Sequence, residues 1–335
     1  EDIDVTPEGT IQCKFFGLGS DGTVGANKQA VEIIGDNTDL FAQAYFAYDS
    51  KKSGGVTISH LRFGKKPIKA PYAIASADFI SCSNQSYVNL YDLAAGLKDG
   101  GTFLLNCVWT PEELEEKLPN KLKKYLAQHN INFYTINAVN IARELGLGNR
   151  TNMIMQSAFF KLSNVIPIDE AVVYMKDQIK KAYGRKGEKV VNMNNAAVDA
   201  GINNLVKIDV PAAWANLPDN DDVVTDKIDK DEPDFVKNIM RPMNRLEGDS
   251  LPVSAFVGAE DGTFPPGTSR YEKRGVAAFV PRWIKENCIQ CNQCSFVCPH
   301  ASIRPILLTE GELQGAPATF ETIPAIGKQL SGLSF

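Results

Sequence analysis

Apolar residues recur along the first 210 residues with two different spacings. Short apolar or alternating runs are typical of strands, whereas apolar residues three and four apart are typical of one face of a helix. The runs predict strands at 11–16, 41–48, 56–63, 79–82, 103–107 and 131–136. Helices are predicted at 23–34, 87–97, 153–162, 169–182 and 190–206, and a further helix opens at Pro111, where Thr110 can cap it.

Strands that alternate with helices predict a largely parallel sheet covered by helices. We therefore expect an α/β fold class with a mostly parallel, Rossmann-like sheet. The pattern changes at Pro211, and residues 219–234 read DNDDVVTDKIDKDEPD, which is too acidic to bury and predicts a solvated linker or strap. The expected regions are an N-terminal arm at 1–10, an α/β domain at 11–210, a small connecting domain or linker at 211–250, and a turn-rich third region at 251–335.

The composition narrows the classes of function. Apolar residues make up 44% and charged residues 22% of the 335 residues, which excludes a wholly disordered chain. The net charge is −5, from 35 basic and 40 acidic residues, so there is no basic excess for general binding to a nucleic acid. No apolar run is long enough to cross a bilayer and no basic–apolar leader starts the chain, so we expect a cytoplasmic protein without a membrane partner.

Four of the seven cysteines lie within eleven residues. They read CIQCNQCSFVCP from Cys288 to Pro299, which is the C-x2-C-x2-C-x3-C-P run of bacterial ferredoxins. Three thiolates at this spacing can each reach a different iron of one cubane, and in two-cluster ferredoxins the fourth cysteine ligates the other cluster. We therefore predict that Cys288, Cys291 and Cys294 bind one [4Fe–4S] cluster and that Cys298 binds a second.

Other interpretations of the cysteine run are weaker. Structural zinc prefers two separated pairs of ligands, and a disulfide framework does not suit a chain without a secretion signal. His300 is expected to be a polar neighbour of the cluster loop. No cysteine follows Cys298, so the second cubane lacks its other ligands, and the iron–sulfur domain is expected to be completed by another stretch of polypeptide. Cys13, Cys82 and Cys107 occupy buried-strand positions and are predicted to be core residues.

A glycine-rich turn follows the first predicted strand. Residues 17–27 read GLGSDGTVGAN, in which Gly17, Gly19 and Gly22 match G-x-G-x-x-G just before the first predicted helix. The backbone N–H groups of such a turn and the helix dipole can hold a phosphate or a pyrophosphate. The same glycines can also serve only the close packing of a strand against a helix.

The end of the second predicted strand bears on which nucleotide such a turn would hold. A nicotinamide cofactor requires an acid about 20 residues after the turn. Asp49 lies near the right place but farther along, and Lys51 and Lys52 follow it beside a Gly-Gly turn. Two lysines suit extra phosphates better than a bare ribose. Coenzyme A carries a pyrophosphate and a 3′-phosphate, so it fits this charge pattern, although a plain solvated loop would also contain such lysines.

Five stretches together resemble the pyruvate:ferredoxin (flavodoxin) oxidoreductase family. They are GLGSDGTVGANK at 17–28, YDSKKSGG at 48–55, GNRTNMIMQ at 148–156, GTSRYEKRG at 267–275 and CIQCNQCSFVCPHASIRP at 288–305. The resemblance covers nearly the whole chain. It implies that the α/β domain is a coenzyme A-binding domain of the gamma type found in 2-oxoacid oxidoreductases, and that the third region is the first half of an α+β ferredoxin-like domain.

The resemblance also implies an activity and its cofactors. The family decarboxylates pyruvate oxidatively on thiamine diphosphate with Mg²⁺, forms acetyl-CoA, and passes electrons through [4Fe–4S] clusters to a ferredoxin or a flavodoxin. This chain would then supply coenzyme A binding and electron relay, together with the rest of its own polypeptide, in a homodimer of full-length chains. The implied coenzyme A contacts are Gly19, Ser20, Asp21, Gly22, Thr23, Lys51 and Asn152.

The sequence departs from the family layout in three respects. Neither the N-terminal pyruvate-binding domain nor the second cysteine run is found in it. It also contains no GDG-type diphosphate motif, so the thiamine-binding part is expected outside this chain, which should be inactive alone. No residue is assigned as a general acid or base, and His60 and His129 are expected to be structural. A reductase that uses a nicotinamide nucleotide and carries a fused ferredoxin module is the alternative function. A free-standing electron carrier is a third, but it would not need such a large α/β domain.

Overall fold

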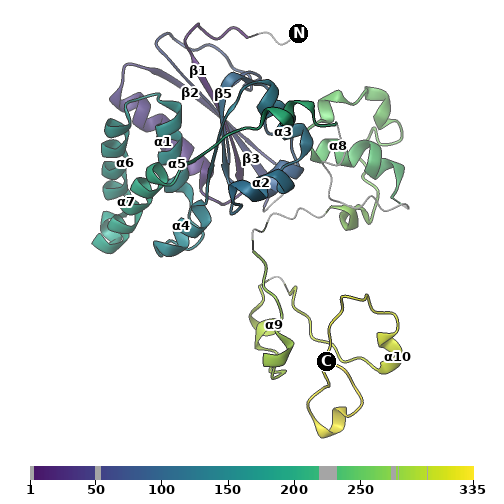
Figure 1. The fold of residues 1–335 in the computed structure, drawn as a ribbon. Helices are drawn as coiled ribbons and strands as arrows, with labels where there is room; N and C mark the ends of the chain where they lie inside the picture. Colours follow the sequence, from purple (N-terminus) through teal and green to yellow (C-terminus); the bar gives the residue numbers. More distant parts are fainter. Residues whose placement is uncertain (1–3, 50–53, 219–231, 273–276, 278, 300) are drawn as a thin grey trace. The chain divides into compact units, whose positions relative to one another are not determined.

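The computed structural model describes residues 4–49, 54–218, 232–272, 277, 279–299 and 301–335. The chain divides into two compact units, Glu1–Ala278 and Phe279–Phe335 (Figure 1). Lys51, Lys52, His300 and most of the acidic stretch lie outside the described residues. The domain borders expected at 210 and 250 stay predictions. Within the described ranges, none of the helices combines the length and the apolar character that crossing a bilayer requires.

A seven-stranded sheet of order β2-β3-β1-β4-β5-β6-β7 forms the centre of the first unit. β1, β4, β5 and β6 pair in parallel, whereas β3 and β7 run antiparallel to their neighbours. The predicted α/β class with a mostly parallel sheet is confirmed. β2 and β3 are antiparallel neighbours because the segment that joins them is too short for a parallel crossover. The other edge of β3 pairs with β1, so β3 lies between the two. The strands are β1 Ile11–Leu18, β2 Phe41–Tyr48, β3 Val56–Gly64, β4 Ala77–Cys82, β5 Leu97–Asn106, β6 Asn132–Ile136 and β7 Val206–Ile208.

Helices cover both faces of this sheet, which makes three layers (Figure 1). Each face has its own cluster of buried residues. One cluster contains residues of α1, α4, α5, α6 and α7, and the other contains residues of α2 and α3. Thr110 caps α2 as predicted: its hydroxyl accepts the Glu113 N–H, and the Glu113 carboxylate accepts the Thr110 N–H. The helices are α1 Thr23–Asn37, α2 Pro111–Lys117, α3 Asn120–Gln128, α4 Ala138–Glu144, α5 Asn152–Ser163, α6 Ile168–Tyr183 and α7 Glu188–Asn203.

Two predicted helices differ from the structure. Instead of a helix at 87–97 the chain forms the short 3₁₀ helix η1, Gln85–Asn89, and then turns into β5. Gly96 has φ 77° and its carbonyl accepts the Ala77 N–H at 2.7 Å, a geometry that a continuing helix could not provide. The helix predicted at 190–206 ends at Asn203, and its last expected residue opens the edge strand β7.

The core of the first unit contains a set of packed rings and the three scattered cysteines. The Phe159 ring centroid lies 5.1 Å from that of Phe15 and 5.4 Å from that of Phe79. Cys13, Cys82 and Cys107 are all buried, which confirms that they are core residues. Burial raises the pKa of the Cys82 thiol to about 12 and that of the Cys107 thiol to about 11, so both stay protonated and unreactive at neutral pH.

Within the first unit, buried polar side chains hold the connecting segment in place. The indole N–H of Trp214 donates to a carboxylate oxygen of Glu115 at 2.6 Å. Glu232 is fully buried and forms a two-pronged ion pair with Arg241, whose nearest N–O distance is 2.6 Å. The prediction of a solvated stretch is therefore wrong for Glu232, because the Arg241 guanidinium compensates its charge. Arg241 begins α8, Arg241–Asn244, which follows the π-helical turn η4, Val236–Met240.

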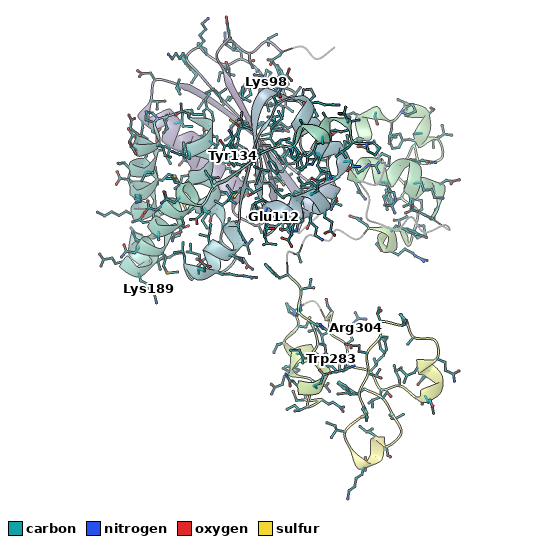
Figure 2. The ribbon with its side chains drawn as sticks, in the orientation of Figure 1. Lys98, Glu112, Tyr134, Lys189, Trp283 and Arg304 are labelled. Carbon is teal, nitrogen blue, oxygen red and sulfur yellow. The ribbon has the colours of Figure 1, made fainter. Side chains whose placement is uncertain are left out.

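The second unit has short elements and no buried described residue. In Figure 2 the side chains of the first unit fill the space between the sheet and the helices, whereas those of the second unit, Trp283 and Arg304 among them, line a chain without a packed interior. Its elements are η8 Lys285–Asn287, α9 Gln293–Val297, α10 Glu310–Leu313 and η9 Lys328–Leu330. Two isolated bridges join Ser334 to Leu308 and to Pro324.

Candidate functional site

The glycine-rich turn connects β1 to α1 and lies against the end of the β2–β3 hairpin. The N–H of Gly19 donates to the carbonyl of Gly55 at 2.8 Å, and the N–H of Asp21 donates to the carbonyl of Leu18 at 2.9 Å. A Cβ built on Gly19 would stand 3.2 Å from the Gly55 oxygen. Glycine at this position therefore allows two backbone segments to approach more closely than any larger residue would.

Gly22 sets the direction in which α1 leaves the turn. It is the N-cap residue of α1 and has φ 90°, a conformation that residues with a Cβ rarely adopt. A Cβ on Gly22 would stand 3.2 Å from the Cβ of Asn152, the first residue of α5. The structure therefore brings Asn152 directly against the turn. Ser20 also has a positive φ, 74°.

Asp21 braces the turn from within. Its carboxylate accepts the Leu18 N–H at 2.9 Å and the Thr23 N–H at 2.7 Å. It also accepts the Ser83 hydroxyl at 2.9 Å, and that hydroxyl lies 3.1 Å from the hydroxyl of Thr23. Because these donors occupy the carboxylate, Asp21 and Thr23 are suited to holding the turn in shape rather than to contacting a ligand.

A cleft of about 540 Å³ opens beside the turn. Residues of the turn, of the start of α1 and of the hairpin end line it. The first N–H groups of a helix have no partner within the helix. Asp21 takes the N–H of Thr23, which leaves the N–H groups of Val24 and Gly25, both at the cleft, to face a ligand. The cleft can therefore bind an anion through backbone N–H groups and the dipole of the fifteen-residue helix α1.

A buried hydroxyl at the cleft adds a second polar group. Thr57 lines the cleft and is 6% exposed, and its Oγ1 has no hydrogen-bond partner in the described part of the chain. A buried hydroxyl without a partner is costly, so a ligand oxygen or a water is expected to satisfy it. Among the described residues, the charged side chains lining the cleft are Asp21 and Asp49. Lys51, the predicted cation of the site, lies outside the described residues.

The cysteine run surrounds α9 in the second unit. None of these four cysteines is in a disulfide; Cys291 and Cys294 are exposed, and Cys288 and Cys298 are half-buried. The structure does not bring three of them together: across the described residues, no group of three His, Cys, Asp or Glu side chains has the geometry of a metal site. The spacing of the four cysteines is nevertheless that of bacterial ferredoxins, in which cluster binding itself assembles such loops. The N–H of Ser302 donates to the Cys298 sulfur at 3.3 Å.

Gln290 anchors the cysteine loop to the last part of the chain. It lies between the first two cysteines of the run with φ 55°. Its side-chain amide donates to the Pro324 carbonyl at 2.8 Å and accepts the Ile326 N–H at 2.7 Å. One side chain therefore satisfies a donor and an acceptor on a segment 34 to 36 residues away, which restrains the loop before a cluster is present.

Both described histidines make contacts within the fold. His60 is buried, and its Nδ1 accepts the Ile74 N–H at 3.1 Å. Burial, together with the positive charges of Lys14 and Arg62, lowers the pKa of His60 to about 4, so the ring is neutral at pH 7. His129 lies 2.6 Å from Asp99 and stacks on a tyrosine ring.

The sequence prediction missed Ser83, Thr57 and Gln290. Ser83 and Thr57 contribute single hydroxyls from strand ends that are far from the glycine turn in the sequence, and no local motif marks them. Gln290 occupies a variable position within the ferredoxin spacing. Its φ is the only unusual feature, and φ cannot be seen in a sequence.

Comparison with family models divides the chain into three matched stretches. Residues 12–204 match the model described as pyruvate ferredoxin/flavodoxin oxidoreductase. Residues 222–277 match a domain of unknown function, and residues 281–304, which contain the cysteine run, match a 4Fe–4S binding domain. The first match spans more than half of the chain.

Two similar proteins extend this result. The chain is 64% identical over 328 residues to the pyruvate-flavodoxin oxidoreductase of Enterobacter agglomerans, covering 98% of the chain and 28% of that protein. It is 57% identical over 335 residues to the pyruvate:ferredoxin oxidoreductase of Moorella thermoacetica, covering 100% of the chain and again 28% of that protein. The chain therefore spans little more than a quarter of the length of these relatives.

A solved structure, the pyruvate oxidoreductase subunit PORC from Thermotoga maritima, is similar with a TM-score of 0.48 and 17% identity, covering 59% of this chain and 98% of that one. The family match over residues 12–204, the 4Fe–4S match over the cysteine run and the two relatives agree with one another. The chain belongs to the pyruvate ferredoxin/flavodoxin oxidoreductase family.

Proposed function

We propose that this chain is the coenzyme A-binding and electron-relay part of a pyruvate:ferredoxin or pyruvate:flavodoxin oxidoreductase. The complete enzyme would convert pyruvate and coenzyme A to acetyl-CoA and CO2 and release two electrons. One observation carries the proposal. A single chain of this family has a cleft at the N-terminus of α1 and also a cysteine run that lies in a match to a 4Fe–4S binding domain.

In the first unit, the N–H groups of Val24 and Gly25 and the Thr57 hydroxyl would hold the diphosphate of coenzyme A. Gly19 and Gly22 would keep the turn narrow enough for that approach, with Ser20 at the mouth of the cleft. Asp21 and Thr23 would act as braces. Asn152 would present its amide beside Gly22, and Lys51 would supply a positive charge for the phosphates.

In the second unit, Cys288, Cys291 and Cys294 would hold one [4Fe–4S] cluster and Cys298 would ligate another. The cluster supplies one-electron transfer when it is bound, and the chain supplies thiolates and N–H groups such as that of Ser302, which tune the cluster potential by bonding to sulfur. The absence of any buried described residue from 279 to 335 supports a domain that another part of a longer protein completes.

The other components of the reaction belong to that longer protein. Thiamine diphosphate and Mg²⁺ would bind there, since this chain has no diphosphate motif for them. A ferredoxin or a flavodoxin would accept the electrons, and two full-length chains would form a homodimer in the cytoplasm. Alone, the chain would bind coenzyme A and carry a cluster without turning over pyruvate.

Calorimetric titration of the 335-residue chain with coenzyme A and with NAD⁺ tests the first half of the proposal. We expect coenzyme A to bind and the nicotinamide nucleotide to bind far more weakly. Tighter binding of NAD⁺ would instead favour the nucleotide-dependent reductase, for which Asp49 at the cleft would be the ligand of the ribose 2′-hydroxyl.

Anaerobic reconstitution with iron and sulfide tests the second half. We expect iron and EPR signals for a single cluster that is lost in Cys291→Ser and kept in the matched variant Cys107→Ser, whose sulfur is buried in the first unit. Two intact cubanes in the wild-type chain would contradict the assignment of Cys298 to a cluster shared with another stretch of polypeptide.

A further inference from the structure

A second pocket adjoins the glycine-turn cleft. It has a volume of about 240 Å³ and lies between the end of the β2–β3 hairpin and α8 of the connecting segment. Tyr48, Asp49 and Val56 line both this pocket and the cleft. A ligand that extends beyond the cleft therefore meets this second pocket around the same hairpin end.

The lining of the second pocket is mainly aromatic and aliphatic. Tyr48, Tyr91, Ile58, Met243 and Leu246 contribute to it, and the side chain of Asn244 adds an amide. Several of these apolar side chains are unusually open to solvent: Tyr48 is 62% exposed, Met243 46% and Leu246 51%. Exposed apolar groups gathered around a concave site are typical of a binding surface.

Leu246 occupies a position that normally carries glycine. It ends α8 in a Schellman motif, in which its N–H donates to the Met243 carbonyl at 3.0 Å and the Glu247 N–H donates to the Pro242 carbonyl at 2.9 Å. Its φ is 65°, in the left-handed region that disfavours a branched side chain. Glycine would be more stable here. The chain instead keeps a leucine at this strained position, and this leucine lines the pocket, which is typical of a residue kept for a function.

The chemistry of the lining suits a flat heteroaromatic ring. Tyrosine faces and a thioether pack well against a purine, because every base presents a π face that stacks on aromatic groups. The Asn244 amide offers both a donor and an acceptor, as the edge of adenine requires. The volume of about 240 Å³ is below the roughly 300–1,000 Å³ of sites for a complete small ligand, so it fits one part of a larger molecule.

We propose that this pocket binds the adenine ring of the coenzyme A whose diphosphate occupies the glycine-turn cleft; the inference rests on the function proposed above. The connecting segment then forms one wall of the nucleotide site through Met243, Asn244 and Leu246. These residues belong to the stretch that matches a domain of unknown function, and the inference gives that domain a role in recognising the base.

Calorimetry on the 335-residue chain with two ligands separates the base from the rest of the coenzyme. Coenzyme A carries adenine, and 4′-phosphopantetheine does not. In Leu246→Gly we expect coenzyme A to bind roughly fivefold more weakly because an apolar side chain leaves the ring. In Tyr48→Ser we expect a loss of roughly tenfold, the order of a lost base–aromatic stack. The affinity for 4′-phosphopantetheine should stay the same in Leu246→Gly, because Leu246 lines only the second pocket, whereas Tyr48 lines the cleft as well.

Protein stability distinguishes lost contacts from damaged folding. Leu246→Gly should unfold at the same or a higher temperature than the wild type, because glycine relieves the strained φ, so its weaker binding cannot come from unfolding. Phe41→Ser is the matched control: Phe41 is 46% exposed on the same strand as Tyr48 but at its other end, and its loss should leave the coenzyme A affinity unchanged.

Two results would overturn the inference in different ways. If the wild-type chain binds coenzyme A but both pocket variants bind it equally well, the adenine lies elsewhere and the proposed function stands. If the wild-type chain does not bind coenzyme A at all, the proposed function fails and the adenine site fails with it.

Discussion

Replacing Gly22 by alanine places a methyl group at a position of the glycine turn that combines a positive φ with a close neighbour. Gly22 holds φ at 90° as the N-cap of α1, and Asn152 lies against its Cα. The change adds no charge and removes no side-chain hydrogen bond. Its whole effect therefore comes from the backbone conformation and from the crowding of one added methyl group.

The expected loss follows from these two terms. The left-handed conformation costs an L-residue about 1–2 kcal/mol relative to glycine. The new Cβ would stand 3.2 Å from the Asn152 Cβ, so α5 or the turn must move by a few tenths of an ångström. We expect Gly22→Ala to lower the free energy of unfolding of the first unit by about 2 kcal/mol, with strain as the larger part.

Urea unfolding followed by the fluorescence of the buried Trp214 measures this loss. Gly35→Ala is the matched control, because Gly35 lies in the same helix, has no positive φ, and would have no atom within 4 Å of its added Cβ. Alanine there should raise the free energy of unfolding by about 1 kcal/mol through helix propensity. Equal effects of the two substitutions, or a stabilising effect of Gly22→Ala, would refute the account of the turn.

Three further predictions concern pH, charge and thiols. The pKa of His60 is about 4 in the fold and 6.5 when unfolded. The unfolded chain therefore binds more protons in this window, and stability should fall by on the order of 3 kcal/mol as pH drops from 6.5 to 4. His60→Gln should remove this pH dependence of the free energy of unfolding, measured by denaturation at several pH values. A pH dependence that persists in the variant would contradict the assignment to His60. Arg241→Met leaves the Glu232 carboxylate buried without its partner and should cost about 3–5 kcal/mol in urea unfolding. Lys98→Met breaks the exposed ion pair with Asp78 and should lower the free energy of unfolding by less than about 1 kcal/mol. Similar losses in the two variants would refute the difference between a buried and an exposed ion pair. Titration of the cluster-free chain with a thiol reagent should modify four of the seven cysteines before unfolding and the remaining three only after it, whereas a fifth fast thiol would show that the core assignment is wrong.

Local patterns predict the strands and the glycine turn because each depends on neighbouring residues. Alternating apolar positions predict β3, and three glycines at fixed spacing predict the turn before α1. The helix expected at 87–97 fails for a nonlocal reason: Tyr87 and Leu97 are both buried in the core cluster beside α2 and α3, so their spacing imitates one helix face. The chain reaches that core through η1 and a glycine turn instead.

The site residues show the same difference between features that local sequence predicts and features that depend on distant residues. The family resemblance places Asn152 with the turn, and the structure brings them into contact, although nothing local connects residues 130 positions apart. Ser83 and Thr57 reach the turn only because the sheet order puts β4 and β3 on either side of β1. The positive φ of Leu246 and its place with Tyr48 in the lining of one pocket depend on how the connecting segment packs, which no sequence spacing encodes.

A crystal structure of the 335-residue chain with coenzyme A tests the central claim most directly. The account predicts diphosphate oxygens within hydrogen-bond distance of the Val24 and Gly25 N–H groups and of the Thr57 hydroxyl. Coenzyme A bound with its diphosphate away from the N-terminus of α1 would contradict it.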